Sequence, residues 1–220
     1  HVFTIGDEEY NRYMRTEWSF EKRGDQALFE KICLEGAQSG LSWRTILRKR
    51  EAYRRTFYQF DAHRVAKMTA ADVESILASD KGNLEDTIVR HRGKVEATIN
   101  NAKSLLKMLE DAGDTETALD KFLWSFVDDK PILNRWGANF DPHDPSSLRN
   151  CPSKTSESEA MSKALKKQGW KFVGPTTCYA LMQSTGMVID HPLNAPEWEA
   201  AKQRLLKRPG GFQDPQNVKK

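Results

Sequence analysis

Glu35 lies in the stretch ICLEGAQSGLSW, residues 32–43, which ends at Trp43, and Tyr10 and Tyr13 stand earlier in the chain. Residues three apart, as these two tyrosines are, share one face of a helix. Aromatic faces and a carboxylate together can hold a flat cationic ring by stacking, charge and hydrogen bonding. The alternatives are an exposed carboxylate at a helix end and aromatic side chains that fill the core. The spacing alone favours these alternatives.

Basic side chains gather in two segments. Residues 44–55 carry six basic residues against the single acid Glu51, and residues 89–94 add three more with no acid. Around Gly93 we expect a tight turn with positive φ, joining a helix near 86–90 to a longer one, whose N–H groups can bind phosphate. A solvated helix face and an ordinary helix connection are the alternatives. The two clusters together favour a polyanionic partner.

Helices are the elements expected to position these residues, because helical spacing recurs along the chain whereas alternating β-branched runs are absent. Asp25 is expected to cap the helix that carries Glu35, and Ser42 to begin one that continues to Phe60. Further helices are expected to begin at Asp61 and at Thr69, with Asp72 completing a capping-box variant, and over 95–109, 117–127, 156–169, 175–188 and 195–208. The prediction is an all-α protein with roughly eight or more helices.

Length and composition indicate a soluble globular protein: 220 residues, of which 38% are hydrophobic and 30% charged. No apolar run approaches the ~18 residues that span a bilayer, and the first residues lack the pattern of a secretory signal. Three widely spaced cysteines favour a reducing intracellular compartment over a disulfide framework. We expect a monomer with one domain over 1–208, a surface loop insertion over 128–154 and a flexible tail over 209–220.

Several long segments, in order, resemble the DNA-3-methyladenine glycosylase I family of the helix-hairpin-helix DNA glycosylase superfamily. They are LFEKICLEGAQSGLSWRTILRKREAYRRTFYQFD, IVRHRGKVEATINNA, FLWSFV and SKALKKQGWKFVGPTTCYALMQSTGMVIDH. The resemblance runs from about Tyr10 to His191, leaving out 128–154 and a short insertion near 80–85. It is far more specific than any single motif above.

The resemblance implies a reaction, which is hydrolysis of the N-glycosidic bond of 3-methyladenine in double-stranded DNA that contains alkylated purines. Free 3-methyladenine and an abasic site are the products, and no cofactor is expected. Methylation at N3 makes the base cationic and a good leaving group. The enzyme must therefore mainly extrude the base, recognise it and stabilise an oxocarbenium-like transition state.

The resemblance also implies roles for individual residues. Glu35 matches the pocket carboxylate that hydrogen-bonds the adenine edge, and it is our candidate catalytic residue and general base. Tyr13 and Trp43 match the stacking aromatics, with Tyr10 alongside. The loop that enters the gap left by the flipped base matches Gln38, Ser39, Gly40 and Leu41. The hairpin that grips the DNA backbone matches Arg90, His91, Arg92, Gly93 and Lys94.

Bacterial members typically join their termini through a zinc ion held by two Cys and two His. Of these positions His191 remains, His1 is a possible second ligand, and Met14 and Ala195 stand near the other two. Two candidate ligands cannot complete a tetrahedral structural site, so we expect no zinc. The segment 195–208 is expected to hold the C-terminus by packing instead.

Other activities fit the sequence less well. A non-catalytic helix-hairpin-helix DNA-binding protein that has lost glycosylase activity is one alternative, and a helical scaffold with merely solvated basic clusters is another. Lyase chemistry on the abasic product needs an amine nucleophile that forms a Schiff base. Since no lysine directly adjoins the pocket motif, we expect a monofunctional enzyme.

Overall fold

The computed structural model describes residues 7–79, 85–113, 116–141, 144, 147 and 151–215. These residues form eleven α-helices and only two short strands, which confirms the all-α class. The helices are α1 Glu8–Thr16, α2 Asp25–Gln38, α3 Trp43–Arg48, α4 Arg50–Thr56, α5 Ala62–Val65, α6 Ala70–Ala78, α7 Arg92–Ala112, α8 Ala118–Trp124, α9 Ser156–Lys167, α10 Pro175–Ser184 and α11 Pro196–Leu206. Short 3₁₀ helices span Tyr58–Phe60 and Ser125–Val127, and the strands are β1 Ile132–Leu133 and β2 Val188–Ile189.

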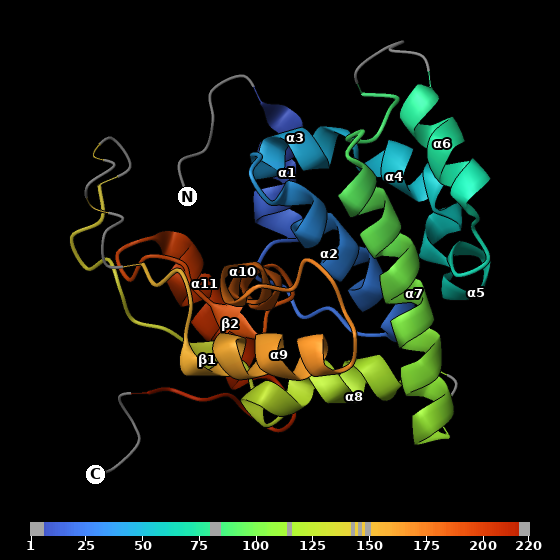
Figure 1. The fold of residues 1–220 in the computed structure, drawn as a ribbon. Helices are drawn as coiled ribbons and strands as arrows, with labels where there is room; N and C mark the ends of the chain where they lie inside the picture. Colours follow the sequence, from blue (N-terminus) through green and yellow to red (C-terminus); the bar gives the residue numbers. More distant parts are fainter. Residues whose placement is uncertain are drawn as a thin grey trace.

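Helix α2 lies at the centre of the bundle and packs against α3, α7, α8 and α10 (Figure 1). Its apolar side chains Leu28, Phe29, Ile32 and Leu34 are buried, so nearly every face of this helix meets a neighbour. Burial on all sides fixes both its axis and its rotation, because interior packing tolerates little movement. A functional side chain on α2 is therefore held on a rigid element.

Three predicted helix starts are confirmed by their caps. The side chains of Ser42, Asp61 and Thr69 accept hydrogen bonds from backbone N–H groups of the first turns of α3, α5 and α6. Thr69 and Asp72 form the reciprocal capping box. These caps satisfy amide groups that have no partner inside the helix, which is why local sequence reveals them.

The predicted helix from Ser42 to Phe60 is wrong in its continuity, because the chain bends at Lys49 and forms α3 and α4 separately. The expected role of Asp25 is also wrong. The capping position of α2 is Gly24, and the Asp25 carboxylate accepts from the backbone N–H groups of Leu119 and Asp120, at 3.1 and 2.8 Å. Asp25 thus satisfies the free amides at the start of α8, a partner that lies far away in the sequence.

The helix expected near 86–90 is absent from the described residues 85–91, and the tight turn at Gly93 is wrong. The chain is extended there because its backbone groups bind elsewhere: the N–H of Val89 donates to the Tyr53 hydroxyl, and the carbonyl of Thr87 accepts from Lys49. Gly93 lies in the first turn of α7 without a positive φ.

The predicted surface loop over 128–154 and flexible tail after 208 both need correction within the described residues. Strand β1 pairs in parallel with β2, and Leu133 is fully buried. The N–H of Leu133 donates to the carbonyl of Gln213, and Arg135 pairs with Asp214 at 2.6 Å. Backbone pairing across about 80 residues holds the tail as far as Asp214; residues 216–220 lie outside the description.

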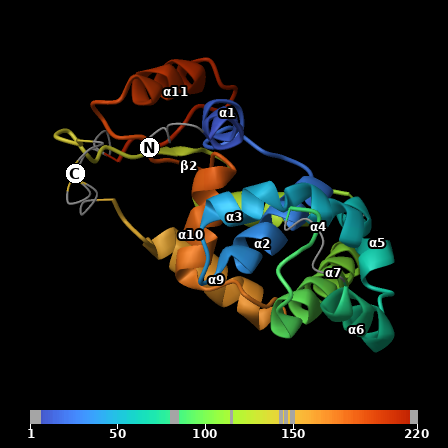
Figure 2. The same ribbon diagram turned by 90° about the horizontal axis from the view of Figure 1, so that it is seen from above.

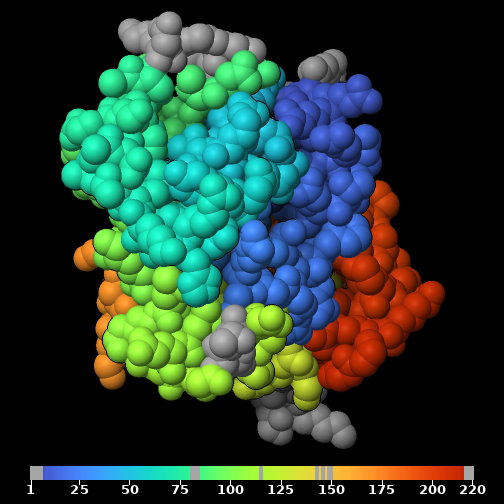
Figure 3. Space-filling model, turned by 90° about the vertical axis from the view of Figure 1, so that its right-hand side faces the viewer, coloured from blue at the N-terminus to red at the C-terminus, as the bar shows by residue number. Residues whose placement is uncertain are grey.

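Figure 2 shows α1 and α11 at one end of the molecule and α5 and α6 at the other. The prediction that 195–208 packs onto the fold is confirmed, since Trp198, Ala201 and Leu205 of α11 form an apolar cluster with Leu133 and Ile189. On the face seen in Figure 3, the N-terminal and C-terminal segments adjoin each other. Among the described residues, none of the helices combines the length and apolar character that crossing a bilayer requires.

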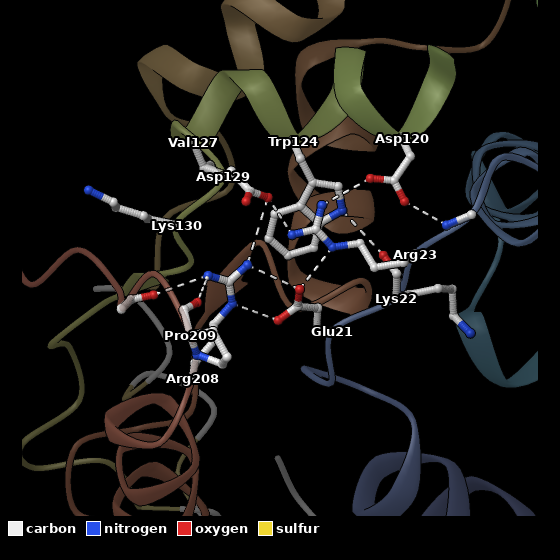
Figure 4. Close-up of polar contacts among 12 residues, drawn as sticks. Glu21, Lys22, Arg23, Asp120, Trp124, Val127, Asp129, Lys130, Arg208 and Pro209 are labelled. Atoms are coloured by element: carbon white, nitrogen blue, oxygen red, sulfur yellow. Dashed lines mark hydrogen bonds and ion pairs between the residues drawn. The ribbon is translucent and has the colours of Figure 1, made fainter. Parts of the chain in front are cut away.

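A cluster of charged residues around Trp124 joins three distant segments (Figure 4). The Arg23 guanidinium lies 3.7 Å from the centre of the Trp124 ring and donates to Asp120 at 2.9 Å. Arg208, which follows α11, binds both carboxylate oxygens of Glu21, at 2.7 and 3.1 Å. The two arginines hold the segment before α2, the helix α8 and the C-terminal segment together.

Candidate base-binding site

Glu35 lies on α2 and is only 4% exposed, so the alternative of an exposed carboxylate at a helix end is wrong. The Ser184 hydroxyl, at the end of α10, donates to its Oε1 atom at 2.8 Å. Lys31, one turn earlier on α2, places Nζ 3.3 Å from the same oxygen. A buried carboxylate is costly unless it is paired and hydrogen-bonded, and these two partners supply both requirements.

Two aromatic side chains lie against the Lys31 ammonium that pairs with this carboxylate, and we call the group of Glu35, Tyr13 and Trp43 the cage. Tyr13 comes from α1 and Trp43 from the start of α3, and their ring centroids are 5.3 Å apart at an angle of 41°. Burial, together with the nearby charge of Glu35, raises the pKa of Tyr13 well above its usual value, so its hydroxyl stays protonated. The structure places Glu35, Tyr13 and Trp43 around one ammonium, and their role in binding a base stays a prediction.

Tyr10 stands beside this cage rather than inside it. It is partly buried and packs against the cluster that contains Tyr13, and the Arg44 guanidinium lies 5.7 Å from its ring centre. Asp7, which caps α1, pairs with Arg44 at 2.9 Å. Burial raises the pKa of Tyr10. Its position supports a role in holding α1 and α3 together next to the cage.

Lys31 is the residue of the site that sequence reasoning missed. Its ammonium lies 4.3 Å from the centre of the Trp43 ring and 3.1 Å from the Tyr13 hydroxyl, and its side chain is buried. Burial lowers its pKa, while the charge of Glu35 opposes that shift. The expectation that no lysine adjoins the pocket motif is therefore wrong. The four-residue spacing between Lys31 and Glu35 was the available signal, because such residues are neighbours on a helix.

The four-residue loop that follows α2 lies at the surface, and its contact with DNA stays a prediction. Ser39, Gly40 and Leu41 are exposed, and Gly40 has φ of 77°, which favours glycine. Leu41 is one of the few large apolar side chains on the described surface. Gln38 ends α2 and is partly buried. An exposed leucine on a tight loop has the shape of an apolar wedge.

The predicted DNA-binding residues 90–94 surround the start of α7, close to that loop. Lys94 Nζ donates to the carbonyl oxygens of Ala37 and Ser39, at 2.8 and 2.7 Å. Its charge therefore stabilises the C-terminal end of α2. The His91 side chain caps α7. Arg92 pairs with Glu74 at 2.7 Å, and Arg90 donates to the carbonyl of Ser79. Arg90, His91 and Arg92 are exposed and can still meet a polyanion.

Phe172 is an exposed residue near this loop that sequence reasoning did not single out. It has φ of 55° and is 37% exposed, and a Cβ built on Gly36 would lie 3.1 Å from its Cβ. Its ring meets the His91 ring edge-on, with centroids 6.4 Å apart. Gly36 therefore permits close packing of α2 against the segment before α10, rather than breaking the helix.

The residues nearest the family's zinc positions do not fit a metal site. The ring of His191 is buried and packs edge-on against Trp18, with centroids 4.9 Å apart. Met14 belongs to an apolar cluster, and Ala195 precedes α11. His1 lies outside the described residues. Within the described part of the chain, no group of three or more His, Cys, Asp or Glu side chains is placed to hold a metal ion.

Comparisons with known proteins agree with this geometry. The sequence model of the methyladenine glycosylase family matches residues 3–197. The DNA-3-methyladenine glycosylase of Haemophilus influenzae is 46% identical over 193 residues, covering 87% of this chain and 94% of that protein. DNA-3-methyladenine glycosylase 1 of Escherichia coli is 45% identical over 185 residues, covering 84% of this chain and 89% of that protein.

Solved structures give the same result. A crystal structure of 3-methyladenine DNA glycosylase I superposes with a TM-score of 0.76 at 43% identity, covering 88% of this chain and 96% of that chain. The Staphylococcus aureus enzyme, studied for its recognition of 3-methyladenine, superposes with a TM-score of 0.73 at 33% identity. The match covers 89% of this chain and 94% of that chain. The chain therefore belongs to the methyladenine glycosylase family.

Proposed function

We propose that the protein removes 3-methyladenine from alkylated DNA by hydrolysing its N-glycosidic bond, with the flipped base held by Glu35, Tyr13 and Trp43. Membership of the family makes the protein a DNA-3-methyladenine glycosylase, and no observation favours a non-catalytic DNA-binding protein. The observation that carries the proposed site is the buried Glu35 carboxylate on the central helix α2, whose partner Lys31 also contacts Tyr13 and Trp43.

The charge of the lesion explains why such a cage suits the reaction. A 3-methylated adenine in DNA is cationic, so the carboxylate of Glu35 attracts it while the rings of Tyr13 and Trp43 stack on it. An unmodified adenine is neutral, so its contacts with the carboxylate and the rings contribute less binding energy. The Ser184 hydroxyl, 2.8 Å from Oε1, fixes the orientation of the carboxylate before the base arrives.

The cleavage itself needs little acid catalysis, because the bond electrons move into a base that is already positive. The negative charge of Glu35 stabilises the positive charge that develops on the sugar in the transition state. The second role that we propose for Glu35 is general base, accepting the proton of the attacking water. Extrusion of the base costs a few kcal/mol, which contacts in the cage must recover.

The DNA is proposed to lie across the loop of residues 39–41 and the N-terminus of α7. Leu41 would fill the gap left by the flipped base, as apolar wedges do in other DNA-bending proteins. The free N–H groups at the start of α7 would bind a backbone phosphate, with the exposed Arg90 and Arg92 nearby. Such contacts set the register on DNA without reading its sequence.

The test is release of free 3-methyladenine from methylated DNA by the wild type and by Glu35→Gln and Trp43→Ala. We expect roughly a 100-fold or greater loss of kcat/KM in each variant, because each removes a contact to the charged base. Glu110→Gln, which changes an exposed carboxylate on α7, is the matched control. A wild type that binds DNA normally and releases no base would favour the non-catalytic alternative.

We further propose that the protein acts as a monomer in the DNA-containing compartment of its cell. A single chain contains the cage, the loop and the start of α7, so the proposed site needs no residue from a second copy. Sedimentation with and without a lesion-containing duplex would test this stoichiometry.

A further inference from the structure

We infer that Lys31 competes with the base for the cage and displaces the product after hydrolysis; this inference rests on the proposed base-binding role of Glu35, Tyr13 and Trp43. The ammonium of Lys31 already occupies the position suited to a cation. It lies 3.3 Å from Glu35 Oε1, 3.1 Å from the Tyr13 hydroxyl and 4.3 Å from the Trp43 ring centre.

These contacts leave no place for a base while Lys31 stays. The rings of Tyr13 and Trp43 are 5.3 Å apart, which is within the range of rings in direct contact. The ammonium covers the face of Trp43 on which a base would stack and holds the carboxylate that a base would meet. Entry of a base therefore requires that the Lys31 side chain leaves.

A cavity next to the cage can receive the displaced ammonium. Its volume is about 130 Å³, and Lys31 and Trp43 line both this cavity and the cage. Glu17 and Glu30 also line it and carry carboxylate oxygens, which pair with Arg50 at 2.6 Å and with Arg54 at 2.8 Å. Lys22, Arg50 and Arg54 line the same cavity, so a rotated Lys31 side chain meets cations as well as carboxylates there, and its return to Glu35 is favoured once no cationic base holds that carboxylate. The backbone of α2 need not move.

The reaction itself changes which occupant the cage prefers. Before cleavage the base is a cation, and its charge holds Glu35 and repels the ammonium of Lys31. When the bond between C1′ and the base breaks, its electron pair stays on the base, which becomes neutral. Water adds to C1′, and its proton passes through Glu35 to solvent, which leaves the Glu35 carboxylate charged again. Glu35 is then paired with a neutral ring, so the return of the Lys31 ammonium is favoured and the product is expelled.

The inference predicts that removing the Lys31 charge tightens binding of the product. We would titrate neutral 3-methyladenine against wild type, Lys31→Met and Lys22→Met, following tryptophan fluorescence. An internal competitor lowers apparent affinity by the fraction of molecules it blocks, so Lys31→Met is expected to bind about tenfold more tightly. Lys22→Met removes a nearby charge without emptying the cage, and its Kd is expected to stay within about twofold of wild type.

Kinetics provide a readout that a merely structural role would not change. On an oligonucleotide with one lesion, Lys31→Met should keep the single-turnover rate within a few-fold, show a burst of product, and then turn over slowly because release has become limiting. Equal or weaker product binding by Lys31→Met, without a burst, would overturn the inference while leaving the glycosylase activity intact. A wild type that releases no 3-methyladenine from the lesion oligonucleotide would instead overturn the proposed function.

A measurement on the wild type covers the case in which the variant does not fold. With lysine labelled at Cε, one resonance should be displaced by the ring current of Trp43. We expect it to return toward the position of ordinary lysines as 3-methyladenine saturates the protein. A displaced resonance that does not respond at saturation would show that Lys31 stays in place and would refute the competition.

Discussion

The Nζ atom of Lys94 lies 2.7 Å from the carbonyl oxygen of Ser39, so one side chain of α7 holds the loop that follows α2. The same atom binds the carbonyl of Ala37 at 2.8 Å. The unpaired carbonyls at the C-terminus of α2 favour a cation there. This relationship joins the helix that carries Glu35, the proposed wedge loop and the N-terminus of α7 into one unit.

The first prediction concerns this contact. Lys94→Met should lower the free energy of unfolding by about 1–2 kcal/mol and reduce kcat/KM, because the loop loses its support. The slope of log Kd for DNA against log salt should stay the same, since Lys94 serves carbonyl groups rather than phosphate. A slope reduced by about one would show that Lys94 binds the DNA backbone instead. Lys103→Met, an exposed lysine on the same helix, is the control.

The second prediction concerns Ser184, which the geometry places behind Glu35. Ser184→Ala removes the hydroxyl that orients the carboxylate and should lower kcat/KM about 3- to 10-fold, a loss near 1 kcal/mol. Ser162→Ala is matched to it, because Ser162 is also buried but donates to the carbonyl of Val173 at 2.6 Å, outside the cage. Equal losses of activity in both variants would mean that only stability had been measured.

The third prediction is a dependence of stability on pH. Burial lowers the pKa of His191 to about 4, and the positive charge of Arg204 acts in the same direction. Since the unfolded chain binds this proton near pH 6.5, the neutral ring stabilises the fold fully above that pH, and this stability is lost as pH falls toward 4. The loss should approach about 3 kcal/mol.

Urea unfolding between pH 4 and 7 provides the measurement for His191. His191→Gln should flatten the dependence over this interval, whereas His63→Gln, which changes an exposed histidine on α5, should leave it unaltered. If His191→Gln also retains the wild-type dependence of the unfolding free energy on pH, groups other than His191 govern acid unfolding.

The fourth prediction separates a shielded ion pair from an exposed one. Arg208 binds Glu21 through two hydrogen bonds, and its side chain is only 11% exposed. Arg208→Ala should therefore lower the free energy of unfolding by more than about 1 kcal/mol. Arg55 pairs with Asp86 at 3.3 Å with both side chains exposed, and Arg55→Ala should cost less than about 0.5 kcal/mol. Chemical unfolding curves would compare them; equal costs would contradict a stabilising role for the cluster around Trp124.

Sequence alone determined the features that depend on neighbouring residues. Apolar spacing indicated the all-α class, and the caps at Ser42, Asp61 and Thr69 were predicted because a cap binds amides within three residues of itself. The resemblance carried Glu35, Tyr13 and Trp43 into one site. Spacing alone had favoured an exposed carboxylate and core aromatics.

Tertiary structure decided the features whose partners are distant in the chain. Asp25 caps a helix 94 residues away, and Ser184 reaches Glu35 across 149 residues. The break at Lys49 and the extended chain near Val89 arise because their polar groups bind other segments. Lys31 combines both cases. Its pairing with Glu35 follows from helical spacing, but only the meeting of α1, α2 and α3 places its ammonium beside the rings of Tyr13 and Trp43, where we propose that the charged base binds.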